Sequence, residues 1–309
     1  MAVFKSLWHD NRGISGTALL AGVLCVASCL HIAAYWLRQE AEETQRMVLR
    51  RQLHSAVQAL AKSGFKDAPL PEGGLRLPPY KLYPGGYTLT AGITEQQNSS
   101  GITRYNLTAA AGSEKFSLQQ LKITLPQRVK EVGQHYTLAS GKTLTGAENL
   151  PEGMAYAENM GSILTDIDVK NFAAFQEKAF PTKTMFEEYG LSGALYYDDG
   201  NYSKSIASPS KNIKGQGFLA AKMSIFIADA AKMPDFCVII SDGQIEVGKN
   251  AVLGKALLLS KYDITIKSGA AVNGIVLCDG RLIVENGAAV TRDESVLQPF
   301  VTAYRLKQQ

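Results

Sequence analysis

The sequence predicts an α+β protein anchored in a membrane, with a long N-terminal helix, an antiparallel β-meander and a C-terminal β-solenoid of about 19-residue coils. Three observations predict this fold class. Residues 13–37 carry no charged side chain, residues 87–125 alternate polar and apolar positions, and residues 217–300 repeat short apolar segments at a fixed interval. Hydrophobic residues make up 46% of the 309 positions and charged residues 19%, so the chain can bury a core.

The uncharged run is long enough to cross a bilayer as a helix. At ~1.5 Å per residue it reaches ~37 Å, against a hydrocarbon core of ~30 Å. Arg12 and Arg38 bound the run, and Tyr35 and Trp36 lie at its far end, where an aromatic belt is expected. The lipid bilayer is therefore a predicted partner.

Helical signal continues beyond this run. Residues 38–62 contain no Gly or Pro, and Lys62 followed by Gly64 indicates a helix end. Apolar side chains recur at helical spacing on one face, at Leu49, Leu53, Ala56 and Leu60. One continuous helix is expected within residues 14–63, half in lipid and half outside it.

A short charged leader ending in Arg-Gly, an apolar run and an amphipathic extension together resemble the type IV pilin superfamily. Residues 11–20 (NRGISGTALL) carry the resemblance, which covers residues 1–63. It implies that a prepilin peptidase removes residues 1–13 by cutting after Gly13. Most members carry Glu at the fifth position after the cut, where this chain has Ala18. Loss of that Glu is known among atypical minor pilins and pseudopilins. The filament-packing residues implied are Ile14, Ala18, Leu49, Leu53 and Leu60.

Two other interpretations of the N-terminal segment stay open. It could be a plain single-pass anchor, or Val26-Ala-Ser-Cys29 could be a lipoprotein cleavage site with Cys29 as the lipid carrier. Basic residues after the span favour a cytoplasmic C-terminal side by the positive-inside rule, whereas the pilin resemblance implies export. Because those basic residues are interleaved with Glu, we expect the C-terminal domain to be extracytoplasmic. The expected location is the bacterial inner membrane, with incorporation into a surface filament as a further option.

The middle of the chain changes period from helix to strand. Residues 64–86 are rich in Pro and Gly and predict a linker. Alternating segments near 87–94, 102–109 and 116–125 predict an antiparallel meander, so residues 64–126 form the β region. Residues 127–216 show no clear pattern and are expected to be mixed and loop-rich.

The C-terminal part repeats itself. Ile239-Ile-Ser241, Leu258-Leu-Ser260 and Leu277-Cys-Asp279 recur at intervals of 19, which predicts a β-solenoid over residues 217–300 and a tail over 301–309. Cys237 and Cys278 are expected as free buried thiols, because they lie two coils apart. The predicted solenoid core consists of Ile240, Leu259, Cys278, Ile245, Ile264, Val252, Val272 and Val290.

This pattern resembles the β-helical tails of PilX-like minor pilins and also the bactofilins, which polymerise from stacked coils. The first resemblance implies a structural minor pilin-like subunit of a type IV pilus or a related secretion or DNA-uptake filament. Its partners would be other pilin or pseudopilin subunits. Its exposed solenoid would serve adhesion or capping, and a surface ligand, if there is one, is not identified by the sequence. The alternative is a single-pass membrane-anchored solenoid scaffold that polymerises or binds a cell-envelope partner.

No chemistry-bearing motif emerges from the sequence. The four histidines are scattered, and no Cys/His cluster has metal-ligand spacing. Asp166, Asp168 and Glu177 depart from a calcium loop, because Lys170 and Asn171 stand where a ligand and a Gly are needed. The net charge is +4, of which residues 1–62 contribute +3, so a nucleic-acid partner is not expected. We expect no enzyme activity, cofactor or metal, and no catalytic residue.

Overall fold

The computed structural model describes residues 16–63, 74–82, 86–182, 185, 188–206, 210–303 and 305–306. The chain divides into two compact units. One contains the helix as far as Ala56, together with Pro78–Thr90 and Ala109–Phe116. The other contains Val57–Leu77, Ala91–Thr108 and the described residues from Ser117 onward. Gly13 and Ile14, at the predicted cleavage site, lie outside the described residues.

Helix α2 (Gly16–Ser63) runs unbroken for 48 residues, as expected, and includes Ala18. Its apolar part is exposed in the protein, and it is the one described helix that is long and apolar enough to cross a membrane. Its second half buries Leu49, Leu53, Val57 and Leu60, which are at most 6% exposed. Ala56, predicted on this stripe, is only half-buried, because steps of four, four and three place Val57 on it instead.

The predicted meander is present as β3 (Thr88–Ser99), β4 (Ile102–Ala111) and β5 (Glu114–Ile123). Ser100 and Gly101 form a two-residue turn with φ of 50° and 80°, the left-handed values that a tight hairpin needs. Short strands pair antiparallel with both outer strands of the meander. They are β1 (Leu75–Arg76) and β2 (Tyr80–Lys81) on β3, and β21 (Phe300–Val301) and β22 (Arg305–Leu306) on β5.

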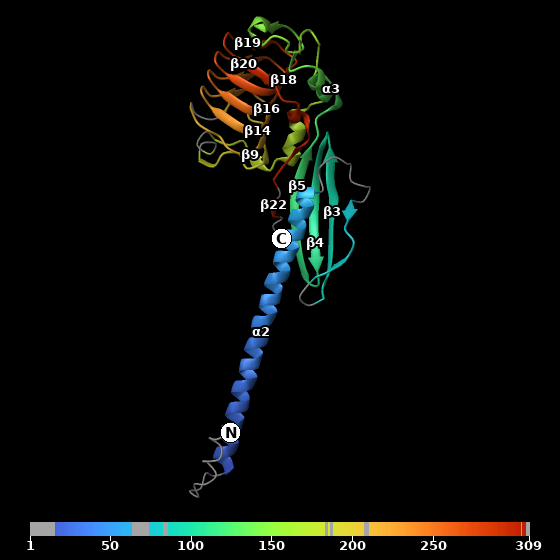
Figure 1. Ribbon diagram of the computed structural model, residues 1–309, viewed down its shortest axis with the longest axis vertical. Coiled ribbons are helices and arrows are strands. Elements are labelled where there is room, and N and C mark those ends of the chain that lie inside the picture. Colours follow the sequence, from blue (N-terminus) through green and yellow to red (C-terminus); the bar gives the residue numbers. More distant parts are fainter. Residues whose placement is uncertain are drawn as a thin grey trace. The chain divides into compact units, whose positions relative to one another are not determined.

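The β-solenoid is built from two parallel sheets, and its strands stack coil upon coil (Figure 1). One sheet contains β10 (Ala194–Asp198), β12 (Gly217–Ala221), β14 (Lys232–Ser241), β16 (Val252–Ser260), β18 (Ala271–Cys278) and β20 (Ala289–Arg292). The other contains β11 (Lys204–Ile206), β13 (Ile225–Ile227), β15 (Ile245–Val247), β17 (Ile264–Ile266) and β19 (Leu282–Val284). The uninterrupted run of coils therefore begins at residue 194, earlier than the predicted 217.

Residues 127–216, which showed no pattern, supply both ends of the solenoid. Strands β6 (Leu138–Ser140) and β7 (Leu144–Thr145) pair parallel with β18 and β19 and form the last coil, although they precede the other coils in sequence. β8 (Tyr156–Ala157) pairs outside β6, and β9 (Lys178–Ala179) pairs outside β10. Along the sequence, β6 and β7 thus contribute to one end of the solenoid, β9 lies at the other end, and the coils from β10 onward lead back toward β6 and β7.

The register of the last coils differs from the prediction. Ile240 lies beside Leu259, but Leu259 lies beside Leu277, so Cys278 follows the Ser241–Ser260 column. The physical reason is a corner with one residue fewer, because three steps from Leu253 to Ala256 face two steps from Val272 to Gly274. Gly is required there, because a Cβ on Gly274 would collide with the carbonyl oxygen of Ala256.

Val252, predicted in the core, is 41% exposed, and its neighbour Leu253 is 1% exposed instead. Leu253 stacks between Met233 and Val272, with Val290 in the next coil. The 20-residue interval from Val252 to Val272 was therefore a coincidence of two valines, and the true interval at this corner is 19.

The larger sheet is buried on both faces, which explains its runs of consecutive apolar residues. Its inner face and the second sheet enclose one core, which holds the predicted Cys278, Ile245, Ile264, Val272 and Val290. Its outer face forms a second core, which holds Ile240 and Leu259. The covering layer consists of α3 (Gln127–His135), the 3₁₀ helices η2 (Val169–Phe175) and η3 (Glu294–Leu297), and the ends of β4 and β5. A third 3₁₀ helix, η1 (Ala147–Asn149), follows β7.

Candidate functional site

The first candidate site is the exposed apolar surface of α2. Between residues 21 and 46 every described side chain is exposed, and Leu30, Trp36 and Leu37 are 65–67% exposed. A soluble protein rarely exposes so large a continuous apolar surface. This surface can be covered by lipid chains or by apolar helices of neighbouring molecules. Cys25 and Cys29 are free thiols on it.

Polar side chains follow this surface along the helix from Arg38 onward and mark where the apolar segment ends. Gln39 donates a hydrogen bond to the Tyr35 hydroxyl at 3.0 Å, and Arg38 pairs with Glu42 at 3.2 Å. Both pairs are exposed and four residues apart, so each adds only a few tenths of a kcal/mol to the helix. Their value is positional, since an amphipathic Tyr and an Arg at this level suit the bilayer interface.

The second half of α2 is held to the meander by contacts within the same unit. Arg50 donates to the Glu114 carboxylate at 2.9 Å, and this hydrogen bond raises the pKa of the Arg50 guanidinium. The His54 ring meets the Phe116 ring edge-on, with centroids 4.8 Å apart. Leu49 and Leu53 are buried on the same face of the helix. The apolar part of α2 and the part that contacts the meander thus belong to one helix without a break.

A polar cavity of about 280 Å³ lies beside these contacts. Arg46 lines it, and the Glu114 carboxylate on its wall is paired with Arg50. Its walls thus combine paired charges with the edge of an apolar stripe, and they hold no arrangement of nucleophile and base. The lining residues are Glu42, Gln45, Arg46, Leu49, Tyr87, Ser113 and Glu114.

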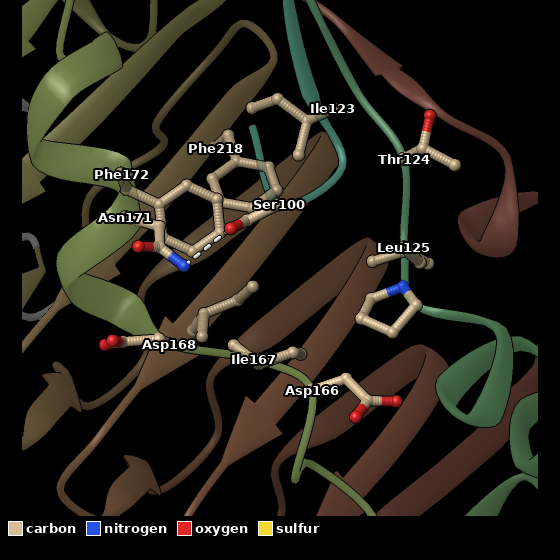
Figure 2. A pocket seen from close by; sticks show the side chains of 12 residues that line it. Ser100, Ile123, Thr124, Leu125, Asp166, Ile167, Asp168, Asn171, Phe172 and Phe218 are labelled. Atoms are coloured by element: carbon tan, nitrogen blue, oxygen red, sulfur yellow. Dashed lines mark hydrogen bonds between the residues drawn. The ribbon is translucent and has the colours of Figure 1, made fainter. Parts of the chain in front are cut away.

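A second hollow, of about 20 Å³, lies where η2 meets the ends of β4 and β5 (Figure 2). A space of this size holds about one water molecule. At its rim the Asn171 amide donates to the Ser100 hydroxyl at 2.8 Å, and Asp168 accepts from the Lys170 backbone N–H at 3.0 Å to cap η2. Phe172 and Phe218 form its apolar wall in Figure 2.

Asp166, Asp168 and Glu177 do not form a calcium site. Asp166 and Asp168 line the small hollow, but the Glu177 carboxylate accepts from the Leu195 N–H at 3.0 Å and from the Thr302 hydroxyl at 3.2 Å. Across the described residues, no group of three or more His, Cys, Asp or Glu side chains could hold a metal ion.

The outer surface of the solenoid carries charges that pair between neighbouring coils. The ion pairs are Lys261–Asp242 at 3.0 Å, Lys267–Glu246 at 2.6 Å and Arg281–Asp263 at 2.7 Å. Each pair joins one coil to the next, so these six charges are matched by a partner of opposite sign in the neighbouring coil. This surface is a candidate for contact with another macromolecule rather than for chemistry.

The two solenoid cysteines are buried and free, as the sequence predicted. Burial raises the pKa of the Cys237 thiol to about 12, and burial likewise raises that of Cys278 to about 12. Both thiols are therefore protonated at neutral pH and unsuited to nucleophilic or redox chemistry.

One polar cluster that the sequence did not reveal fastens the C-terminal segment. The Thr302 hydroxyl accepts from the Leu121 N–H at 3.0 Å and donates to the Glu177 carboxylate at 3.2 Å. The Gln120 amide donates to the Thr302 carbonyl at 2.8 Å. The predicted C-terminal tail thus includes strands on the meander. No pattern in two-residue strands could have revealed this.

No family model matches the chain. No curated protein matches it. No solved structure matches it either. A functional conclusion therefore depends on the helix, the meander and the solenoid themselves.

Proposed function

We propose that this chain is a structural, minor pilin-like subunit of a type IV pilus or of a related secretion or DNA-uptake filament. In this proposal α2 is held in the bacterial inner membrane until assembly and then packs among the helices of other subunits. The body, by which we mean the meander and the solenoid, lies outside the cytoplasm and presents the solenoid as an adhesive or capping surface. The supporting observation is the continuity of α2, whose exposed apolar half and buried half form one 48-residue helix.

This continuity favours a packing helix over a plain anchor. About 20 apolar residues suffice to span a bilayer, and a tether needs no defined geometry beyond them. Here the helix continues without Gly or Pro from residue 38 to 62, and buries Leu49 and Leu53. A filament subunit requires one rigid helix that packs through its apolar part and is attached to the rest of the protein through its other part.

The ends of the solenoid count against the rival scaffold. A polymer of stacked coils needs open sheet edges at both ends. In this protein β8 pairs outside β6, and β9 pairs outside β10, so the larger sheet ends on both sides in a two-residue strand rather than in a full coil strand. The Leu144 N–H at the edge of the last coil is likewise occupied by the Glu158 carboxylate at 3.0 Å.

Fractionation of cells that produce the protein tests the proposal. We expect the wild-type chain in filaments sheared from the cell surface. A Gly13→Val variant should be blocked in processing and stay in the membrane fraction. Ala2→Val is the matched control, because it lies in the same predicted leader but far from the predicted cut, and it should still reach the sheared fraction. Retention of the wild-type chain in the membrane of cells that assemble filaments would refute the proposal and leave the anchored scaffold.

A further inference from the structure

Among the described corners that lead from the larger sheet to the second sheet, one is larger than the others. Three residues connect the sheets in the coils that turn at Ser241–Ile245, Ser260–Ile264 and Cys278–Leu282. The corresponding connection from Asp198 to Lys204 has five residues, although its two ends are in register with the next coil. The two additional residues produce a loop on the outside of the stack.

This loop has a fixed base and an exposed tip. At the base, Lys204 pairs with Asp198 at 2.9 Å, and the Gly200 N–H donates to the Asp198 carboxylate at 3.0 Å. At the tip, Asn201, Tyr202 and Ser203 are all exposed, and Tyr202 is 82% exposed. The side-chain amide oxygen of Asn201 accepts one long hydrogen bond of 3.5 Å from the Lys222 ammonium. Within the described residues, no acceptor engages the Asn201 amide nitrogen.

The tip has the acceptor pattern for N-linked glycosylation. Asn201-Tyr202-Ser203 fits Asn-x-Ser/Thr with a middle residue other than Pro. An oligosaccharyltransferase must bend the acceptor segment into its site, so it needs an exposed loop free of sheet hydrogen bonds.

The other two such triplets in the chain, Asn98-Ser-Ser100 and Asn106-Leu-Thr108, lack this setting. Asn106 lies inside β4, and its side-chain oxygen is buried. Asn98 lies inside β3, and the hydroxyl of Ser100 is engaged by the Asn171 amide at 2.8 Å. The structure therefore separates one usable acceptor from two that resemble it only in sequence.

We propose that Asn201 is an N-glycosylation site, with a lipid diphosphate-linked oligosaccharide as the donor. The Asn201 amide nitrogen attacks the anomeric carbon of the first sugar and forms the C–N bond. The bond from that carbon to the diphosphate oxygen breaks, the lipid diphosphate leaves, and the amide loses one proton. No redox change occurs. The inference rests on one part of the proposed function, the placement of the body outside the cytoplasm, and not on filament assembly.

Intact-mass measurement and peptide mapping of the full chain from its native membranes test this site. We expect the mass to exceed that of the polypeptide by one oligosaccharide, located on the peptide that contains Asn201. Asn201→Gln and Ser203→Ala should lose the whole increment, and Ser203→Thr should keep it. Asn98→Gln and Asn106→Gln are matched controls that should keep it as well.

An unmodified wild-type chain, or an increment that persists in Asn201→Gln, would overturn the inference. The same spectrum reports the N-terminal residue and so separates the two proposals. A glycosylated chain with an uncut N-terminus would refute filament processing and leave the glycosylation site standing.

Discussion

The choice between Val252 and Leu253 as the core residue of one solenoid corner is a sharp test of the register. The sequence interval places Val252 inside, whereas the structure places Leu253 there at 1% exposure and leaves Val252 41% exposed. The two residues are adjacent, so substitution of each by Ala probes the same backbone. We expect Leu253→Ala to destabilise the protein strongly and Val252→Ala to have almost no effect.

The magnitude follows from the packing. Leu253 lies between Met233 and Val272 of the neighbouring coils, which are both 1% exposed, and the stacked backbones cannot move in to fill a cavity. Leu→Ala at such a site costs about 2–5 kcal/mol, and about 3 kcal/mol corresponds to a fall in Tm of about 6–12 °C for a body of this size. A change at the exposed Val252 should stay within about 0.5 kcal/mol.

Thermal unfolding of the full chain in detergent, followed by circular dichroism in the β region, measures both variants. The difference between them is the decisive quantity, because errors from the detergent and from incomplete reversibility affect them equally. Equal shifts, or a larger shift for Val252→Ala, would show that the register is off by one residue at this corner.

Three further predictions concern polar and ionisable groups. Thr302→Val should lower stability by about 1–3 kcal/mol in denaturant unfolding, because it leaves the buried Leu121 N–H without its acceptor. Cys237 should resist maleimide in the folded chain at pH 8, since burial raises its pKa to about 12, and it should react at once after unfolding. Burial of Asp263 opposes its ionisation, but the hydrogen bonds from Arg281 outweigh it and lower the Asp263 pKa. Its stabilising contribution is thus complete above its unfolded pKa of about 3.9 and is lost as pH falls through the lower folded value, so Asp263→Asn should flatten the acid limb of the stability profile.

Each of these has a control within the chain. Thr302→Ser keeps the hydroxyl and should recover most of the lost stability. A thiol introduced by Tyr202→Cys, at a side chain that is 82% exposed, should react with maleimide while Cys237 does not. Arg281→Gln, which removes the guanidinium from the Asp263 carboxylate, should flatten the acid limb as Asp263→Asn does. A Thr302→Ser variant as unstable as Thr302→Val would assign the loss to packing. Labelling of folded Cys237 as fast as the thiol introduced at position 202 would contradict the burial of Cys237.

Strong periodic signals explain why much of the fold could be predicted. An uncharged run followed by a helical stripe predicted α2, and polar-apolar alternation predicted β3 to β5. The constant interval predicted the coils and the inward Ile245 and Ile264, which lie beside each other. These elements depend on local sequence pattern and on stacking between neighbouring coils, and both can be inferred from a single sequence.

The rest depended on contacts far apart in the chain. Strands β6, β7 and β9 have only two or three residues each, too few to show alternation, and they gain their partners from coils that come later in sequence. The error at Cys278 arose because one corner has a residue fewer, so a strict 19-residue projection moved the later positions by one. The exposed Asn201 loop could be found from the triplet, but only the enlarged corner distinguishes it from the two triplets on strands.

The central claim is that α2 is a processed filament helix rather than a plain anchor. Intact mass and terminal sequencing of the chain extracted from its native membranes test it most directly. The account predicts a start at Ile14, directly after Gly13. A lipid-modified start at Cys29 would make the chain a lipoprotein without the apolar half of the helix, and a start at Met1 or Ala2 would leave a single-pass anchor. Either result would contradict the filament proposal.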